Sequence, residues 1–121
     1  MNRARFTLLP VALAVLASAE VAAAADLAKG EAVYEDRCSL CHPADGPGQG
    51  PSLKGVVGRK AASVPGFAYT AALQRSGLTW TPEVLDRFLI APGKLVPGAA
   101  MPMMVPDDNE RRDLIAFLAA H

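Results

Sequence analysis

The 121-residue sequence has few aromatic residues, no net charge, and only two cysteines and two histidines. Phe, Trp and Tyr together make up 6% of it, so side chains alone supply little apolar bulk for the core of so short a chain. The 12 basic and 12 acidic residues cancel. This balance argues against the basic footprint of a nucleic-acid-binding protein and against an acidic solvating tail. A metal or redox site has at most these four cysteine and histidine ligands to use.

Long apolar runs are also missing, apart from one near the N-terminus. Two arginines precede an apolar run of 12 residues from Phe6 to Ala17, and small residues ending Ala23-Ala24-Ala25 follow. This pattern is typical of a secretory signal peptide, whereas a membrane span needs about 20 apolar residues. We therefore expect residues 1–25 to be removed by cleavage before Asp26, or alternatively before Glu20. Residues 26–121 would then form a single domain outside the cytoplasm.

Helical signals flank two stretches rich in proline and glycine, and neither of these shows the alternation of a strand. The signals predict four helices: about 27–38 capped by Asp26, Thr70 to Arg75 ended by Gly77, one opened by Thr81-Pro82 and ended before Pro92, and one behind the capping-box-like pair Asp107 and Glu110. The sequence therefore predicts a small all-α protein with long irregular loops. Long loops in so small a domain usually have a function of their own or enclose a bound group.

One motif carries specific chemistry. Cys38-Ser39-Leu40-Cys41-His42 is C-x-x-C-H, the attachment sequence for c-type haem. Two thiols three positions apart on a helical turn can add to the two vinyl groups of the porphyrin, and the histidine that follows supplies an axial nitrogen. A catalytic dithiol would sit at a strand-to-helix junction that is absent here, and a structural zinc needs four ligands where three cluster. We expect one covalent haem c, which would also supply the missing apolar bulk.

The second axial position of the iron separates an electron carrier from a catalyst, because a strong ligand there closes it to oxygen and peroxide. The candidates are Met101, Met103, Met104 and His121. Met101 follows Pro97-Gly98, a turn dipeptide that could direct its loop back over the haem face. The residues therefore favour Met101 and leave Met103 and Met104 open.

Further ordered matches extend over nearly all of residues 29–117, and with them the chain resembles the class I c-type cytochromes, in particular mitochondrial-type cytochrome c and its small bacterial periplasmic relatives. The matches are Lys29-Gly30, Gly50-Pro51-Ser52-Leu53, Gly58-Arg59-Lys60, Pro65-Gly66-Phe67-Ala68-Tyr69-Thr70, Leu78-Thr79-Trp80, Val96-Pro97-Gly98-Ala99-Ala100-Met101 and Arg112-Asp113-Leu114-Ile115-Ala116-Phe117. The resemblance implies a small class I cytochrome c fold, with four to five helices and long loops wrapped around one haem.

The same resemblance implies roles for single residues. Met101 would be the axial sulfur, and the Pro51 carbonyl would accept the ring N–H of His42. Gly30 would let the first helix cross the last one closely, with Tyr34 against Leu114 and Phe117. The haem propionates would be satisfied by Arg59, Tyr69 and Trp80.

The function that the resemblance implies is one-electron transfer by an exported carrier, which is not an enzyme. Its partners would be redox proteins rather than nucleic acid or membrane, and we expect a monomer in the bacterial periplasm. A haem subunit dedicated to one periplasmic dehydrogenase is the first alternative. A peroxidase or gas-binding protein with a labile methionine is the second. Only four lysines follow residue 25, so the basic docking ring of mitochondrial cytochrome c is largely missing.

Overall fold

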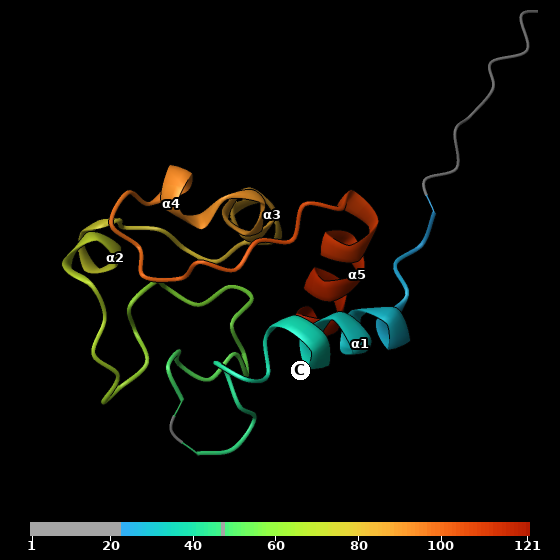
Figure 1. The fold of residues 1–121 in the computed structure, drawn as a ribbon, viewed down its shortest axis with the longest axis horizontal. Helices are drawn as coiled ribbons and strands as arrows, with labels where there is room; N and C mark the ends of the chain where they lie inside the picture. Colours follow the sequence, from blue (N-terminus) through green and yellow to red (C-terminus); the bar gives the residue numbers. More distant parts are fainter. Residues whose placement is uncertain (1–22, 47) are drawn as a thin grey trace, which may run out of the picture.

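Two helices from opposite ends of the domain cross each other on the right of Figure 1. They are α1 (Leu27–Arg37) and α5 (Asp108–Ala119) in a computed structural model that describes residues 23–46 and 48–121. The rings of Tyr34 and Phe117 meet at the crossing, with centroids 5.7 Å apart. The expected contact between the first and last helices is therefore confirmed.

Gly30 makes this close crossing possible. It is buried in α1, and a Cβ built on it would lie 2.6 Å from the carbonyl carbon of Asp113 and 2.8 Å from the Cβ of Phe117. Real Cβ atoms do not approach backbone so closely. Glycine costs about 1 kcal/mol relative to alanine within a helix, and the packing of α1 against α5 gives the reason for it here.

Replacing Gly30 by alanine is expected to destabilise the protein by about 2 kcal/mol or more, because α1 and α5 must move apart. Helix propensity alone predicts the opposite sign. Denaturant unfolding of the haem-loaded protein measures the change, and Glu31→Ala on the exposed side of α1 is the matched control. A Gly30→Ala protein at least as stable as the unsubstituted one would contradict this interpretation of the crossing.

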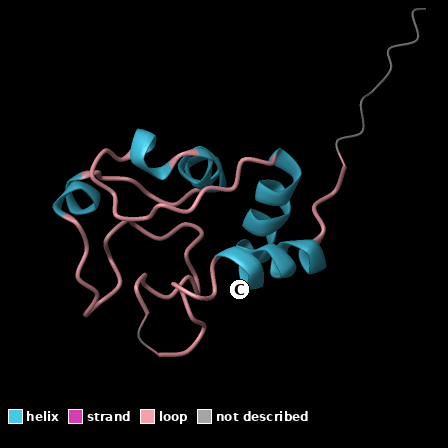
Figure 2. Ribbon diagram, in the orientation of Figure 1, coloured by secondary structure: helices cyan, strands magenta, loops and turns pink. Residues whose placement is uncertain are grey.

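Three shorter helices complete an all-α fold: α2 (Ala71–Arg75), α3 (Pro82–Ile90) and α4 (Pro92–Leu95), coloured cyan with the others in Figure 2. The part of the chain that the structure describes holds no strand, only an isolated bridge between Lys60 and Thr79. Long loops join α1 to α2 and α4 to α5 (Figure 1). The prediction of four to five helices with long loops is confirmed.

The predicted helix starts are confirmed by their caps. Side chains of Asp26, Thr70, Thr81 and Asp107 each accept a hydrogen bond from the backbone N–H three residues on. The capping box is only half formed, because the Glu110 carboxylate lies 2.9 Å from Arg37 of α1 instead of reaching back to Asp107. The sequence analysis missed α4. This helix begins at Pro92, directly after the break that ends α3.

The core is small and lies between α1, α3, α5 and the loops. Leu114 of α5 and Val105 of the loop before it are fully buried. The other buried apolar residues are Tyr34, Cys38, Val56, Trp80, Leu85, Phe88, Leu89, Val96, Ile115 and Leu118.

The N-terminal segment expected to be a signal peptide lies mostly outside the described residues, which begin at Ala23. Ala23, Ala24 and Ala25 are exposed and not helical. Among the described residues, no helix has the length and apolar character needed to cross a membrane.

Candidate haem-binding site

The end of α1 leads the C-x-x-C-H motif into a tight turn. Cys38 caps the helix, and its carbonyl accepts the N–H of His42 at 2.8 Å. Tyr34, one turn earlier, donates its hydroxyl to the His42 carbonyl at 2.7 Å. Cys38, Cys41 and His42 therefore line one cavity, whereas Leu40 is 89% exposed.

The His42 ring is held in one orientation. Its Nδ1 lies 2.7 Å from the Pro51 carbonyl oxygen, so the hydrogen bond that the resemblance implied is present. Because a carbonyl only accepts, Nδ1 carries the proton, and Nε2 is left with the free lone pair that a metal needs. A Cβ on the neighbouring Gly50 would come within 2.5 Å of Nδ1 and 2.7 Å of Nε2. Only glycine at position 50 leaves room for the ring.

The two cysteines are free thiols, one buried and one partly exposed. Burial raises the pKa of the Cys38 thiol to about 11, with the Arg37 cation opposing this shift and Cys41 adding to it. At neutral pH the Cys38 side chain is therefore an uncharged thiol. It brings no charge into the apolar cavity beside it.

The cavity has a volume of about 420 Å³ and is lined mainly by apolar side chains. It brings together all eight residues that were expected to bind the haem: Cys38, Cys41, His42, Pro51, Arg59, Tyr69, Trp80 and Met101. These residues come from the C-terminal end of α1, from the long loop between α1 and α2, and from the segments before α3 and α5.

The structure narrows the candidates for the second axial ligand. His121 packs on Phe117 at the C-terminus, with its Nδ1 2.8 Å from the Phe117 carbonyl, and it does not line the cavity. Met104 is 53% exposed and does not line it either. Met101 and Met103 both do; Met101 packs against the core, whereas Met103 is 42% exposed.

Arg59 and Tyr69 reach the cavity wall while bonded to nearby backbone. The Arg59 guanidinium donates to the carbonyls of Ser52 and Lys54, both at 3.0 Å. The Tyr69 hydroxyl accepts the Val64 N–H at 3.1 Å. Burial lowers the pKa of Arg59, but an arginine remains charged. Their positions are compatible with bonds to haem propionates, which stay a prediction.

Trp80 forms another part of the wall. It is buried, and its ring lies 4.8 Å from that of Phe88 in α3. The backbone of Trp80 exchanges two hydrogen bonds with the loop before it, to Gly58 and Arg59 at 2.8 Å each. The indole is therefore fixed beside the cavity by both its ring and its backbone.

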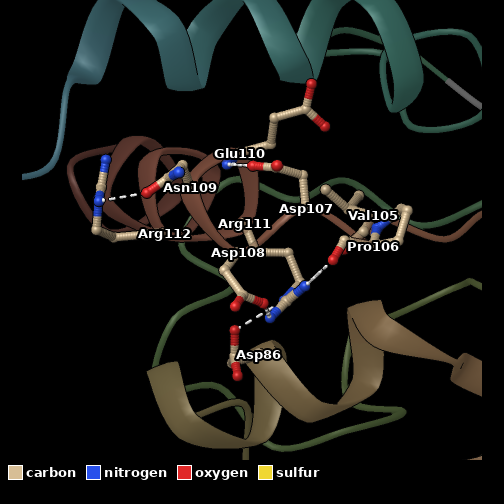
Figure 3. A network of polar contacts seen from close by, with 9 residues as sticks. All are labelled: Asp86, Val105, Pro106, Asp107, Asp108, Asn109, Glu110, Arg111 and Arg112. Atoms are coloured by element: carbon tan, nitrogen blue, oxygen red, sulfur yellow. Dashed lines mark hydrogen bonds and ion pairs between the residues drawn. The ribbon is translucent and has the colours of Figure 1, made fainter.

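A buried arginine that the sequence analysis did not single out holds the loop that carries Met101 (Figure 3). Arg111 of α5 is 4% exposed. Its Nη1 donates to the carbonyls of Val105 and Pro106 at 3.1 and 2.7 Å, and its Nε donates to Asp86 of α3 at 2.8 Å. Nη2 pairs with Asp108.

This network keeps the Arg111 charge in place. Burial opposes the charge, but the hydrogen bonds and charges of Asp86 and Asp108 outweigh burial and hold the arginine pKa above its usual value. A sequence signal existed, because Arg111 stands on the same helical face as Ile115 and Leu118, where a charge needs a buried partner.

These donors fit a covalent c-type haem. Two free thiols, an imidazole with a free Nε2 and a thioether line one apolar cavity, and the glycine beside the imidazole leaves it room. The thiols would hold the porphyrin, and the imidazole and the thioether would hold the iron.

Comparison with known proteins agrees with this chemistry. A family model described as "Cytochrome C oxidase, cbb3-type, subunit III" matches residues 25–118. Cytochrome c2 from Rhodomicrobium vannielii is 44% identical over 113 residues, a match that covers 90% of each chain. The chain belongs to the class I cytochrome c family. This cytochrome is also 40% identical to cytochrome c of Chlamydomonas reinhardtii, over 80% of its own length and 90% of that relative.

Solved structures confirm the fold of the cytochrome. Cytochrome cH from Methylobacterium extorquens superposes with a TM-score of 0.75 and 41% identity, covering 79% of this chain and 99% of that one. Cytochrome c2 from Rhodospirillum centenum gives 0.71 and 34% identity, covering 77% and 95%. The cytochrome accordingly carries one covalent haem c and transfers electrons to and from redox proteins. It is not an enzyme.

Proposed function

We propose that the cytochrome is a freely diffusing one-electron carrier of the bacterial periplasm, with haem joined to Cys38 and Cys41 and iron held between His42 and Met101. The observation that carries the proposal is that an oriented imidazole and a core-packed methionine line the same apolar cavity. Two filled axial positions leave no open site for a substrate, which favours electron transfer over catalysis.

Haem supplies the Fe(III)/Fe(II) couple when bound, and the protein supplies its surroundings. The Pro51 carbonyl keeps the proton of His42 on Nδ1, which fixes the ring and strengthens Nε2 as a donor. The apolar wall excludes water. Arg59, Tyr69 and Trp80, which line the cavity, would neutralise or hydrogen-bond the two propionates.

Export to the periplasm is supported by the N-terminal sequence. Residues 1–25 have the three parts of a signal peptide, and the described end of this segment, Ala23 to Ala25, is exposed and not helical. The bacterial cytochrome c2 relatives point to the same kind of carrier. The domain of residues 26–121 would work as a monomer.

The partner-binding surface that we propose is the apolar rim of the haem cavity. Met103 lines the cavity and is 42% exposed, and Met104 beside it is 53% exposed. Residues 26–121 carry 10 basic and 11 acidic side chains, so the net charge of the domain contributes little to long-range attraction of a redox partner. Of the basic cluster Lys54, Arg59 and Lys60, the arginine is engaged with backbone carbonyls.

Stopped-flow oxidation of the reduced cytochrome by membranes from its source cells tests this proposal. We expect a rate that rises with cytochrome concentration, as diffusion to the partner requires, and that falls only weakly with added salt. A Met103→Ala variant should lower the second-order rate constant, whereas a Lys60→Ala control should not.

Two outcomes would contradict it. A rate independent of cytochrome concentration would indicate a stably bound haem subunit, as in the oxidase that the family model's description names. A steep fall between low and moderate ionic strength would replace apolar docking by charged docking at Lys54 and Lys60.

A further inference from the structure

A buried carboxylate in the last helix binds the chain where the first helix begins. Asp113 of α5 is 3% exposed, and its Oδ1 accepts the backbone N–H of Asp26 at 3.0 Å. The same oxygen accepts Nε and Nη2 of Arg112 at 3.0 and 2.8 Å. These bonds hold the pKa of Asp113 below its usual value, with the Asp26 N–H as the largest cause and Arg112 next. Asp113 is therefore ionised at neutral pH.

The nitrogen that Asp113 binds is the one that signal cleavage would set free. Ala23-Ala24-Ala25 has the A-x-A form of a cleavage site and is exposed and not helical. Asp26 follows it as the N-cap of α1. In the precursor the Asp26 nitrogen is a peptide N–H; after cleavage before Asp26 it is an α-amino group.

We propose that removal of the leader converts this hydrogen bond into an ion pair between the new α-ammonium of Asp26 and the carboxylate of Asp113. Only the mature protein has this ion pair, which strengthens the contact between the start of α1 and α5. The inference rests on the proposed signal cleavage. It makes Asp113 the acceptor of the processed N-terminus.

The conversion strengthens an existing contact because it adds charge and donors at the same place. A peptide nitrogen offers one proton, whereas an α-ammonium offers three and a positive charge. The hydrogen bonds that Asp113 accepts within the described chain all end on Oδ1, so Oδ2 is left as an acceptor for the added protons.

Other charges near the ion pair decide whether it stabilises or destabilises the folded protein. A cation just before a helix opposes the helix dipole, and Lys29 of α1 and Arg112 of α5 are also positive and close to Asp113. Two carboxylates offset them. One is Asp113, and the other is the side chain of Asp26, which caps Lys29 N–H and lies 3.8 Å from the Lys29 ammonium.

The pair gives the mature protein a characteristic pH dependence. Its α-amino pKa should lie above the usual 7.7–8.0. The added stability is then fully present below the unfolded-state pKa and is lost as the pH rises through the higher folded-state value. At the acidic end, it is lost as the pH falls through the lowered pKa of Asp113.

Four exported holocytochromes test the proposal: the native chain, a chain whose engineered leader leaves Ala23–Ala25 in place, and the Asp113→Asn variant of each. The three alanines add no charge but move the α-ammonium away from Asp113. Intact mass gives the N-terminus, denaturant unfolding from pH 6 to 10 gives the unfolding constants, and an NMR titration gives the α-amino pKa.

We expect the native chain to begin at Asp26. At pH 7 its unfolding equilibrium constant should be several-fold smaller than that of the chain that keeps Ala23–Ala25, by roughly tenfold for each unit by which the α-amino pKa is raised. The difference should vanish in the Asp113→Asn pair and at high pH. Equal unfolding constants with an α-amino pKa near 8, or a native chain that begins elsewhere, would overturn the proposal. Neither result bears on electron transfer to membranes, which is measured separately.

Discussion

Replacing Met101 by alanine is expected to remove the sulfur-to-iron charge-transfer band in the near infrared. It should also lower the reduction potential by on the order of 0.1–0.2 V, a fraction of the roughly 0.8 V that axial ligands span. A neutral thioether stabilises ferrous iron relative to a nitrogen or water ligand. Met101 packs against the core, so its sulfur is held in place. A redox titration recorded with visible and near-infrared spectra measures both changes.

The matched control is Met103→Ala, because Met103 lines the same cavity but is 42% exposed. It should keep the band and the potential. The reduced Met101→Ala protein should also bind carbon monoxide readily at neutral pH, whereas the Met103→Ala protein should resist it. If the band survives Met101→Ala and is lost in Met103→Ala or Met104→Ala, the ligand assignment is wrong.

Replacing Cys38 and Cys41 together by alanine is expected to give a largely unfolded, haem-free protein. The cavity that they line has a volume of about 420 Å³. At about 24 cal/mol per Å³, an empty cavity of this volume would cost up to ~10 kcal/mol, which is comparable to the whole stability of a typical domain. The surrounding core is too small to offset that cost. Far-UV circular dichroism and a thermal melt measure the loss.

The control for the cysteine variant is Leu40→Ala, which alters the same motif at a side chain that is 89% exposed. It should keep the haem, the helix content and the melting temperature. Native-like helix content with a cooperative thermal transition in the haem-free double variant would show that the domain folds without its cofactor.

The parts of the fold that could be predicted are those that neighbouring residues determine. Asp26, Thr81 and Asp107 can be identified as helix starts from the sequence because a cap bonds to an N–H only three residues away. The sequence places the second helix at Thr70 to Arg75, and in the structure Thr70 caps it in the same way. The haem attachment motif could be identified for the same reason, because its residues are consecutive in the sequence. It was the resemblance that assigned Pro51 as the partner of His42, and the structure confirms that hydrogen bond at 2.7 Å.

What escaped prediction depends on contacts between distant segments. The break at Ala91 follows from the proline after it, but nothing local says whether the chain then turns into a loop or into the single turn of α4. The partners of Arg111 include Asp86, 25 residues away, and Asp113 finds its partner 87 residues away. Charge and helical spacing identify such residues as candidates for burial, but only the packed structure supplies their partners.

The Arg111 network also bears on how fast an electron can leave the protein. An iron that changes charge pulls on its ligands, and every ligand shift adds reorganisation energy to the barrier. Arg111 ties the carbonyls of Val105 and Pro106 to α3 and α5, so the loop that follows Met101 is anchored against that pull. With Met101 as the iron ligand, this anchoring would limit how far its loop moves when the iron changes charge, because the fold has arranged the loop in advance.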